Sequence, residues 1–212
     1  CLSDPAVRAE IRQKTRDAAL AQKDHGLVAL GIADEAFLAS RHQRCEVCFS
    51  PHCQSRYREW LRQRYGDLDG LNRAWDSAYT AWDQVSGART EDIRGKANLA
   101  PFVDFRQFMT GVWVEACREV VDACHEVAPD LPVGHTNTFG ADPFTGNDYW
   151  RLVTEAGFGW GQEYSEAIKA SAQKAVFDIW QSFVETPEAR RARARPDGTA
   201  PDCADTGERS EA

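Results

Sequence analysis

The stretch Gly26–Phe37, with the sequence GLVALGIADEAF, decides the fold class of this chain. Its first eight residues, Gly26 to Ala33, are mostly apolar, and two adjacent carboxylates, Asp34 and Glu35, end the run. A short apolar run that begins at a glycine and ends in charge is typical of a strand buried on both faces. In a parallel α/β barrel such strands carry their chemistry at the C-terminal end. The stretch predicts a buried strand ending in a candidate general acid, with an ordinary polar loop as the other interpretation.

Composition excludes several classes of protein. The chain has 212 residues, 42% of them apolar and 27% charged, which suits one soluble domain with a sizeable core. The net charge of −8 argues against nucleic acid or an anionic membrane as the main partner. No run approaches the roughly 18 apolar residues of a membrane-spanning helix, and no secretory signal is visible. We expect a cytoplasmic location. Because the chain begins with Cys1 rather than Met, we also expect it to be a piece of a longer protein.

Helix and strand signals alternate along the rest of the chain. Caps, prolines and apolar periodicity predict helices at Asp4–Lys23, Ser50–Gly66, Asp67–Trp75, Leu99–Ala128 (with a bend at Gly111 as an option), Asn147–Glu155 and Ser165–Val184. Short apolar runs predict two further strands at Leu131–Thr136 and Gly157–Trp160. The polar segment Ser77–Asn98 is expected to be irregular, with Trp82 as its anchor.

This alternation, with no hairpin signal, predicts an α/β fold with parallel strands. Three strands cannot close a barrel, and a complete eightfold barrel takes about 250 residues. We therefore expect an incomplete (β/α)8 TIM barrel, roughly strands 4 to 6 with their helices, over residues 1–185. Residues 186–212 are rich in Arg, Ala, Asp, Gly and Pro without apolar periodicity, so we expect a disordered tail.

Three cysteines within nine residues form the sharpest local motif, Cys45-x2-Cys48-x4-Cys53. This spacing indicates a zinc site more than a disulfide framework, and zinc takes four thiolate or imidazole ligands. Three residues are candidates for the fourth ligand: His42 and His52 nearby, and Cys1 farther away in the sequence. A helix that leaves Cys1 and a strand that returns beside it would bring Cys1 back to this loop. Such a site would be structural, because protein ligands fill every position. Structural free thiols are the alternative, and Cys117 and Cys124 are expected to pack as small apolar side chains.

Polar and aromatic residues also follow the other two predicted strands. These candidate substrate-binding residues are His135, Asn137, Trp160, Glu163 and Tyr164. In a barrel they would face the same mouth as Glu35. A glutamic acid acts as an acid at neutral pH only where burial or a neighbouring negative charge raises its pKa. Each of these residues, taken singly, also fits a loop residue that satisfies backbone hydrogen bonds.

The order of motifs resembles a known family. The chain begins with Cys1-Leu-Ser-Asp-Pro, and a strand ending in an acid–Glu pair and the Cys cluster follow. Next come the helix Cys-x3-Tyr-x2-Trp-Leu-x2-Arg-Tyr-Gly and the stretch Leu-Asp-x-Leu-Asn-x-Ala-Trp. Together they look like the catalytic barrel of glycoside hydrolase family 42, the β-galactosidases of clan A, over Cys1 to about Tyr164. The resemblance implies cleavage of terminal β-galactosides with retention, by a Glu acid/base after the fourth strand and a Glu nucleophile after the seventh.

Carried onto this sequence, the resemblance implies specific roles. Glu35 would be the acid/base, Asn137 and Trp160 would lie near the sugar, and a structural Zn²⁺ would bind the four cysteines Cys1, Cys45, Cys48 and Cys53. No organic cofactor is implied. Asp34 departs from the usual Asn of this clan, and an ionised Asp cannot donate a hydrogen bond to the sugar 2-hydroxyl.

We therefore expect a fragment of a retaining glycoside hydrolase with a carbohydrate substrate, and a homo-oligomer is left open for the full-length protein. A seventh strand with its nucleophile is not recognisable. Glu163 and Glu185 are the late acids near apolar runs, and neither has the expected context. The chain alone is then expected to be inactive. The alternatives are a carbohydrate-binding or otherwise specific related barrel, and a non-enzymatic, zinc-stabilised α/β interaction module.

Overall fold

The computed structural model describes residues 1–160, except 28, 34–35, 40–45, 136–143 and 158. Within them, three parallel strands form one sheet in the order β1–β2–β3, with β1 at Leu30–Gly31, β2 at Val133–His135 and β3 at Gly159–Trp160. Gly31 pairs with Gly134, and His135 pairs with Trp160. The three predicted strands are therefore present and parallel, as strands joined by crossover helices must be.

Strand β1 is shorter and more exposed than the sequence predicts. Leu30 is 7% exposed and joins the core, whereas Gly31 and Ala33 are exposed. The N–H groups of Leu30 and Ile32 donate to backbone carbonyls of the β2 segment. Because successive residues of a strand face opposite sides, Leu30 enters the core while Gly31 turns to the other face. The expectation of a strand buried on both faces is wrong for β1.

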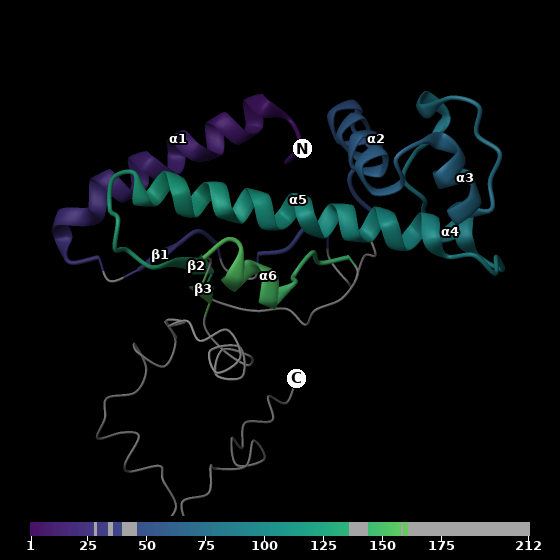
Figure 1. Cartoon of the computed structure of the whole chain (residues 1–212). Coiled ribbons are helices and arrows are strands. Elements are labelled where there is room, and N and C mark those ends of the chain that lie inside the picture. Colours follow the sequence, from purple (N-terminus) through teal and green to yellow (C-terminus); the bar gives the residue numbers. More distant parts are fainter. Residues whose placement is uncertain (28, 34–35, 40–45, 136–143, 158, 161–212) are drawn as a thin grey trace, which may run out of the picture.

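The helix α5 (Ala100–His125) is the spine of the structure. Figure 1 shows α1 (Pro5–Gln22) along one end of α5, and α2 and α3 at the other. Asp4 caps α1 by accepting the N–H of Ala6 at 2.9 Å, one of the two predicted caps. The long helix is continuous through its glycine, as one 26-residue element.

Two apolar clusters meet on α5. The first joins α5 to α1, the sheet and α6, and it contains Cys117 and Cys124, both at most 1% exposed. Their expected role as small buried apolar side chains is confirmed. The second cluster joins the N-terminal half of α5 to α2 (Pro51–Tyr65) and α3 (Leu68–Trp75).

Both α2 and α3 begin at the predicted caps. Ser50 Oγ accepts the N–H of Cys53 at 3.2 Å, and Asp67 Oδ1 accepts the N–H of Gly70 at 2.7 Å. These side chains satisfy N–H groups that a first helical turn leaves without partners. Gly66, with φ of +80°, ends α2 in a conformation that favours glycine.

The segment after α3 contains two short helices, η2 (Trp82–Gln84) and α4 (Thr90–Ile93), which were not predicted. Its anchor is Val85, which is fully buried, whereas Trp82 is half-buried. Trp82 also packs against the second apolar cluster, as an anchor should, but it is less buried than Val85. The guanidinium of Arg62 lies over the Trp82 ring, 4.8 Å from its centroid.

Helix α6 (Tyr149–Thr154) is shorter than predicted and is capped by Asp148, which accepts the N–H of Arg151 at 3.1 Å. β3 follows α6 and is the last described element. The remaining short element, η1 (Lys23–His25), follows α1. The predicted helix at 165–184 and the predicted tail at 186–212 lie outside the described residues. Among the helices that are described, none is long and apolar enough to cross a membrane.

Candidate functional site

The C-terminal ends of the three strands lie at one edge of the sheet. Because Gly31 pairs with Gly134, the next residue, Ile32, lies opposite His135, and His135 pairs in turn with Trp160. Glu35 follows Ile32 by three residues along the chain. The register therefore brings the ends of the strands that precede the predicted catalytic residues to the same edge, where parallel α/β folds place their chemistry.

Most of the predicted catalytic and sugar-binding residues lie outside the described residues. These are Asp34, Glu35, Asn137, Glu163 and Tyr164. Of the remaining two, His135 ends β2 with a fully buried side chain, and Trp160 ends β3. The structure thus describes the strands that would carry the site and not the carboxylates themselves.

The predicted zinc ligands are better described. Cys1 Sγ lies 3.5 Å from Cys48 Sγ, although 47 positions separate the two residues. Cys53 is buried in the first turn of α2, with its Sγ 3.6 Å from Met109 Sδ. Cys45 lies outside the described residues. The expected return of Cys1 to the cysteine loop is therefore observed.

The cysteine pair fits a zinc site in its spacing. Two thiolates at about 2.3 Å from a tetrahedral zinc stand about 3.8 Å apart, close to the observed separation of Cys1 and Cys48. Among the residues that the structure describes, which exclude Cys45 and His42, no group of three or more His, Cys, Asp or Glu side chains is arranged to hold a metal ion. The second local alternative, His52, has its Nε2 3.8 Å from Asp4 Oδ2.

The thiols of the loop have different proton affinities. Burial, the largest effect, raises the pKa of Cys53 to about 11. Burial also acts to raise the pKa of Cys48, but hydrogen bonds from Ser50 and Cys53 outweigh it, so that the pKa of Cys48 is lowered. Zinc binding would require both thiols to lose their protons, since the thiolate is the ligand.

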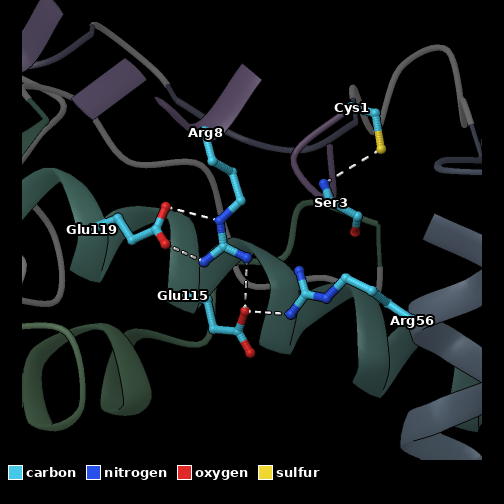
Figure 2. Close-up of polar contacts among 6 residues, drawn as sticks. All are labelled: Cys1, Ser3, Arg8, Arg56, Glu115 and Glu119. Carbon is cyan, nitrogen blue, oxygen red and sulfur yellow. Dashed lines mark hydrogen bonds and ion pairs between the residues drawn. The ribbon is translucent and has the colours of Figure 1, made fainter. Parts of the chain in front are cut away.

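A network of ion pairs holds the N-terminal segment against α5 (Figure 2). Arg8 of α1 donates to Glu119 from Nε at 2.8 Å, and its Nη1 lies 3.3 Å from Glu115 Oε2. Arg56 of α2 donates to the same Glu115 oxygen at 2.5 Å. Glu115 therefore links α1 and α2 on the surface of α5, and this helps to place Cys1, which precedes α1, beside the loop that leads into α2.

Further hydrogen bonds hold the loop from the other side. Glu46 accepts the N–H of Thr90 at 2.5 Å and also the Thr90 hydroxyl. Gln54 donates to the carbonyl of Cys48 at 3.1 Å and accepts the N–H of Gly87 at 2.9 Å. The segment between α3 and α5 thus supports the cysteine loop.

Sequence reasoning missed one functional contact of this loop. Ser50 was predicted as a helix cap, but its Oγ also donates to Cys1 Sγ at 2.9 Å. The N–H of Ser3 approaches the same sulfur at 3.4 Å (Figure 2). Donors of this kind orient metal-bound thiolates. The signal in the sequence was the Ser50-Pro51 pair, but its contact with Cys1 depends on the fold.

The chain resembles β-galactosidases in sequence and in structure. Residues 1–187 match the model of glycoside hydrolase family 42, described as β-galactosidase. The β-galactosidase BglY of Alicyclobacillus acidocaldarius is 30% identical over 158 residues, which are 72% of this chain and 21% of that protein. The chain thus spans about a fifth of the length of this relative.

Solved structures agree with this. A β-galactosidase from Rahnella sp. R3 superposes with a TM-score of 0.60 and 25% identity, over 76% of this chain and 23% of that one. A β-galactosidase from Bacillus circulans sp. alkalophilus has a TM-score of 0.61 at 23% identity, over 77% of this chain and 24% of that one. At this identity the likeness shows the fold alone. A partial TIM barrel is consistent with these matches. On the family match over most of its length, the chain belongs to glycoside hydrolase family 42, the β-galactosidase family.

Proposed function

We propose that this chain supplies the acid/base part of a retaining glycoside hydrolase that acts on terminal β-galactosides or a related glycoside. The observation that carries the proposal is the strand register, in which Ile32, His135 and Trp160 stand side by side at one sheet edge. In the sequence, Glu35 comes three residues after Ile32. Membership of the family supports the reaction class, and the names of the relatives support the substrate class.

Glu35 would act twice in the reaction. It would first donate a proton to the leaving oxygen, and it would then take a proton from the water that attacks the glycosyl-enzyme. Retention also needs a nucleophilic carboxylate about 5–5.5 Å away. The sequence offers no recognisable second carboxylate, so we propose that the chain alone does not turn over substrate.

The residues around Glu35 would contact the sugar. We assign this role to Asp34, His135, Asn137, Trp160, Glu163 and Tyr164. Asp34 would accept hydrogen bonds from sugar hydroxyls and could not donate while ionised. Substrates with a 2-hydroxyl group that can donate would therefore be favoured.

A structural zinc ion belongs to the same proposal. Cys1, Cys48 and Cys53, with Cys45 from the same loop, would hold it, and the spacing of Cys1 and Cys48 supports this set. When bound, the ion would supply a fixed cross-link between the start of α1 and the loop before α2. The Ser50 hydroxyl would orient the Cys1 thiolate.

The test compares Glu35→Gln with Glu155→Gln, a substitution of the exposed glutamate that follows α6. The isolated chain is expected to leave an aryl β-galactoside unchanged. In the complete reading frame, Glu35→Gln should lower kcat/KM for poor leaving groups by at least about 100-fold. With an aryl β-galactoside whose leaving group departs without protonation, added azide should restore turnover as galactosyl azide, since an anion that attacks the glycosyl-enzyme needs no general base. Glu155→Gln should match the unsubstituted enzyme, and equal rates for Glu35→Gln would remove Glu35 from the mechanism.

A non-catalytic, zinc-stabilised module is the second candidate, and the contact of Cys1 with Cys48 favours it equally. It predicts zinc binding without any turnover in the complete reading frame. The same assay therefore separates the two functions.

A further inference from the structure

In the sequence, the candidate acid Glu35 stands between two residues that are hydrogen-bonded to the same neighbouring segment. Before it, the N–H of Ile32 donates to the carbonyl of Gly134 in β2 at 2.9 Å. After it, the N–H of Leu38 donates to the carbonyl of Thr145 at 2.9 Å. The first bond continues the pairing of β1 with β2, whereas the second is a separate tether beyond the end of β2. A short segment that is fixed at both ends has few conformations open to it.

The side chain of Leu38 adds packing to this tether. Leu38 packs against both apolar clusters of the structure. It also lies directly on Gly146, because a Cβ built on this glycine would stand 2.7 Å from Leu38 Cδ1 and 3.1 Å from Leu38 Cγ. The first of these distances is shorter than real Cβ contacts, which essentially never fall below 3.0 Å. Leu38 therefore occupies space that is open only because residue 146 is a glycine.

The segment that accepts the tether is itself fixed to the rest of the fold. Thr145 and Asn147 are both buried, and Asn147 Oδ1 accepts the indole N–H of Trp113 in α5 at 3.0 Å. The N–H of Asp148, the cap of α6, donates to the carbonyl of Gly146 at 2.9 Å. Gly146 has a φ of +77°, in the left-handed region that favours glycine. The tether thus joins the segment of the candidate acid to α5 and α6 through buried contacts.

A general acid acts only where its carboxyl stands within about 2.6–3.2 Å of the oxygen that it protonates. A misplacement of about 1 Å can cost roughly 100-fold in rate. We propose that Leu38, seated on Gly146, is a positioning residue for Glu35. The inference rests on the proposed role of Glu35 as the acid/base. Leu38 would act by fixing the end of the segment that follows Glu35, and not by contact with the sugar.

Hydrogen exchange tests the tether in this chain, because it reports how often a hydrogen bond opens. The Leu38 amide should be protected by at least about 100-fold, and Gly146→Ala should speed its exchange by at least about tenfold. Gly26→Ala is the matched control, since Gly26 has a φ of +74° and a Cβ there would meet nothing within 4 Å. It adds the same backbone strain without the contact, so it should change the exchange of Leu38 by less than about twofold. An unprotected Leu38 amide, or equal exchange in the two variants, would overturn the tether.

The effect on Glu35 is read from the leaving group, in the complete reading frame. Phenolate departs poorly without a proton, whereas dinitrophenolate needs none. Leu38→Ala should therefore lower kcat/KM by at least about tenfold for phenyl β-galactoside, and by no more than about twofold for the dinitrophenyl substrate. Leu27→Ala is the matched control, a partly buried leucine of the same apolar cluster that precedes β1. It should leave the ratio of the two kcat/KM values unchanged. Melting curves would verify that each variant is folded.

Leu38 and Gly146 should also act as one unit. Gly146→Ala should show the same selective loss for the phenyl substrate, because its methyl group displaces Leu38. In the double variant, alanine at position 38 relieves that contact. Its loss should therefore be smaller than the product of the two single losses, as for residues in direct contact. Losses that simply multiply would overturn the seating of Leu38 on Gly146 as the cause.

The positioning role and the role of Glu35 can fail separately. A loss in Leu38→Ala that is equal for both substrates, or a ratio equal to that of Leu27→Ala, would refute the positioning role. Glu35→Gln in the same assay should show the selective loss most strongly. If it does and Leu38→Ala does not, the positioning role alone is refuted. If Glu35→Gln shows no selectivity, the proposed function itself is refuted.

Discussion

The indole N–H of Trp75 donates a hydrogen bond of 2.7 Å to Asp104 Oδ2, which ties α3 to α5. Asp104 is 2% exposed, and the same oxygen accepts the Tyr65 hydroxyl at 2.6 Å. Arg64 Nε lies 3.2 Å from Oδ1. Burial, and then the hydrogen bond to Asp104, raise the pKa of Tyr65. One buried carboxylate therefore joins three helices beneath the segment that supports the cysteine loop.

Asp104→Ala should destabilise the chain by about 3 kcal/mol, because it leaves the buried carboxylate's two partners, the buried indole N–H of Trp75 and the hydroxyl of the half-buried Tyr65, without this acceptor. Asp104→Asn should cost less, since its amide oxygen can still accept. Asp122→Ala is the matched control, an exposed position of the same helix, and should change stability by less than about 0.5 kcal/mol. Urea unfolding curves measure all three. Equal midpoints for Asp104→Ala and Asp122→Ala would contradict this role.

The zinc proposal predicts one zinc ion per chain in a metal analysis. Cys48→Ser should lower zinc affinity by at least 100-fold in competition with a chromophoric chelator, because oxygen replaces a thiolate ligand. Cys124→Ala removes a thiol from the other apolar cluster and should leave zinc affinity unchanged. Removal of zinc by a chelator should lower the melting temperature of the unsubstituted chain and not that of Cys48→Ser. Zinc affinity that is equal in the two variants would refute this ligand set.

Ser50→Ala should have two separable effects. Loss of the cap on the Cys53 N–H should cost about 1 kcal/mol of stability. Loss of the donor to Cys1 Sγ should weaken zinc binding by about tenfold or more. Ser50→Asp can still cap α2 but cannot donate to the thiolate, so it should retain stability without zinc and lose zinc affinity. A Ser50→Asp variant with full zinc affinity would remove the hydroxyl from the site.

Local signals in the sequence predicted much of this fold. The caps at Asp4, Ser50 and Asp67 act on N–H groups two or three residues away, so the sequence alone reveals them. The complete burial of Val85, beside a half-buried Trp82, depends on how this segment packs onto the residues of α2, α3 and α5 in the second cluster. Such a contact leaves no trace in local periodicity.

The candidate site shows the same division. Cys1 and the cysteine loop were placed together by the α/β topology, and the structure confirms this proximity. Ser50 was predicted only as a helix cap, and the contact of its hydroxyl with Cys1 Sγ depends on how the segments before α1 and α2 lie together. Sequence reasoning therefore found the motif and missed one of its contacts.

The buried thiol of Cys117 should make the stability of the folded chain decrease at alkaline pH. Burial raises the pKa of this thiol far above its usual range, and the side chain is 1% exposed. In the unfolded chain the thiol ionises at about pH 8.5, while the folded chain keeps the proton. Its contribution to stability is thus fully present below that pH and declines as the pH rises toward the folded pKa, by about 1.4 kcal/mol per pH unit. Cys117→Ala should therefore show a shallower loss of stability between pH 8.5 and 10 in urea unfolding, although it is less stable at pH 7. Parallel pH profiles for the two proteins would contradict the assignment, and Cys117 alkylated at pH 8 in the folded chain would contradict its burial.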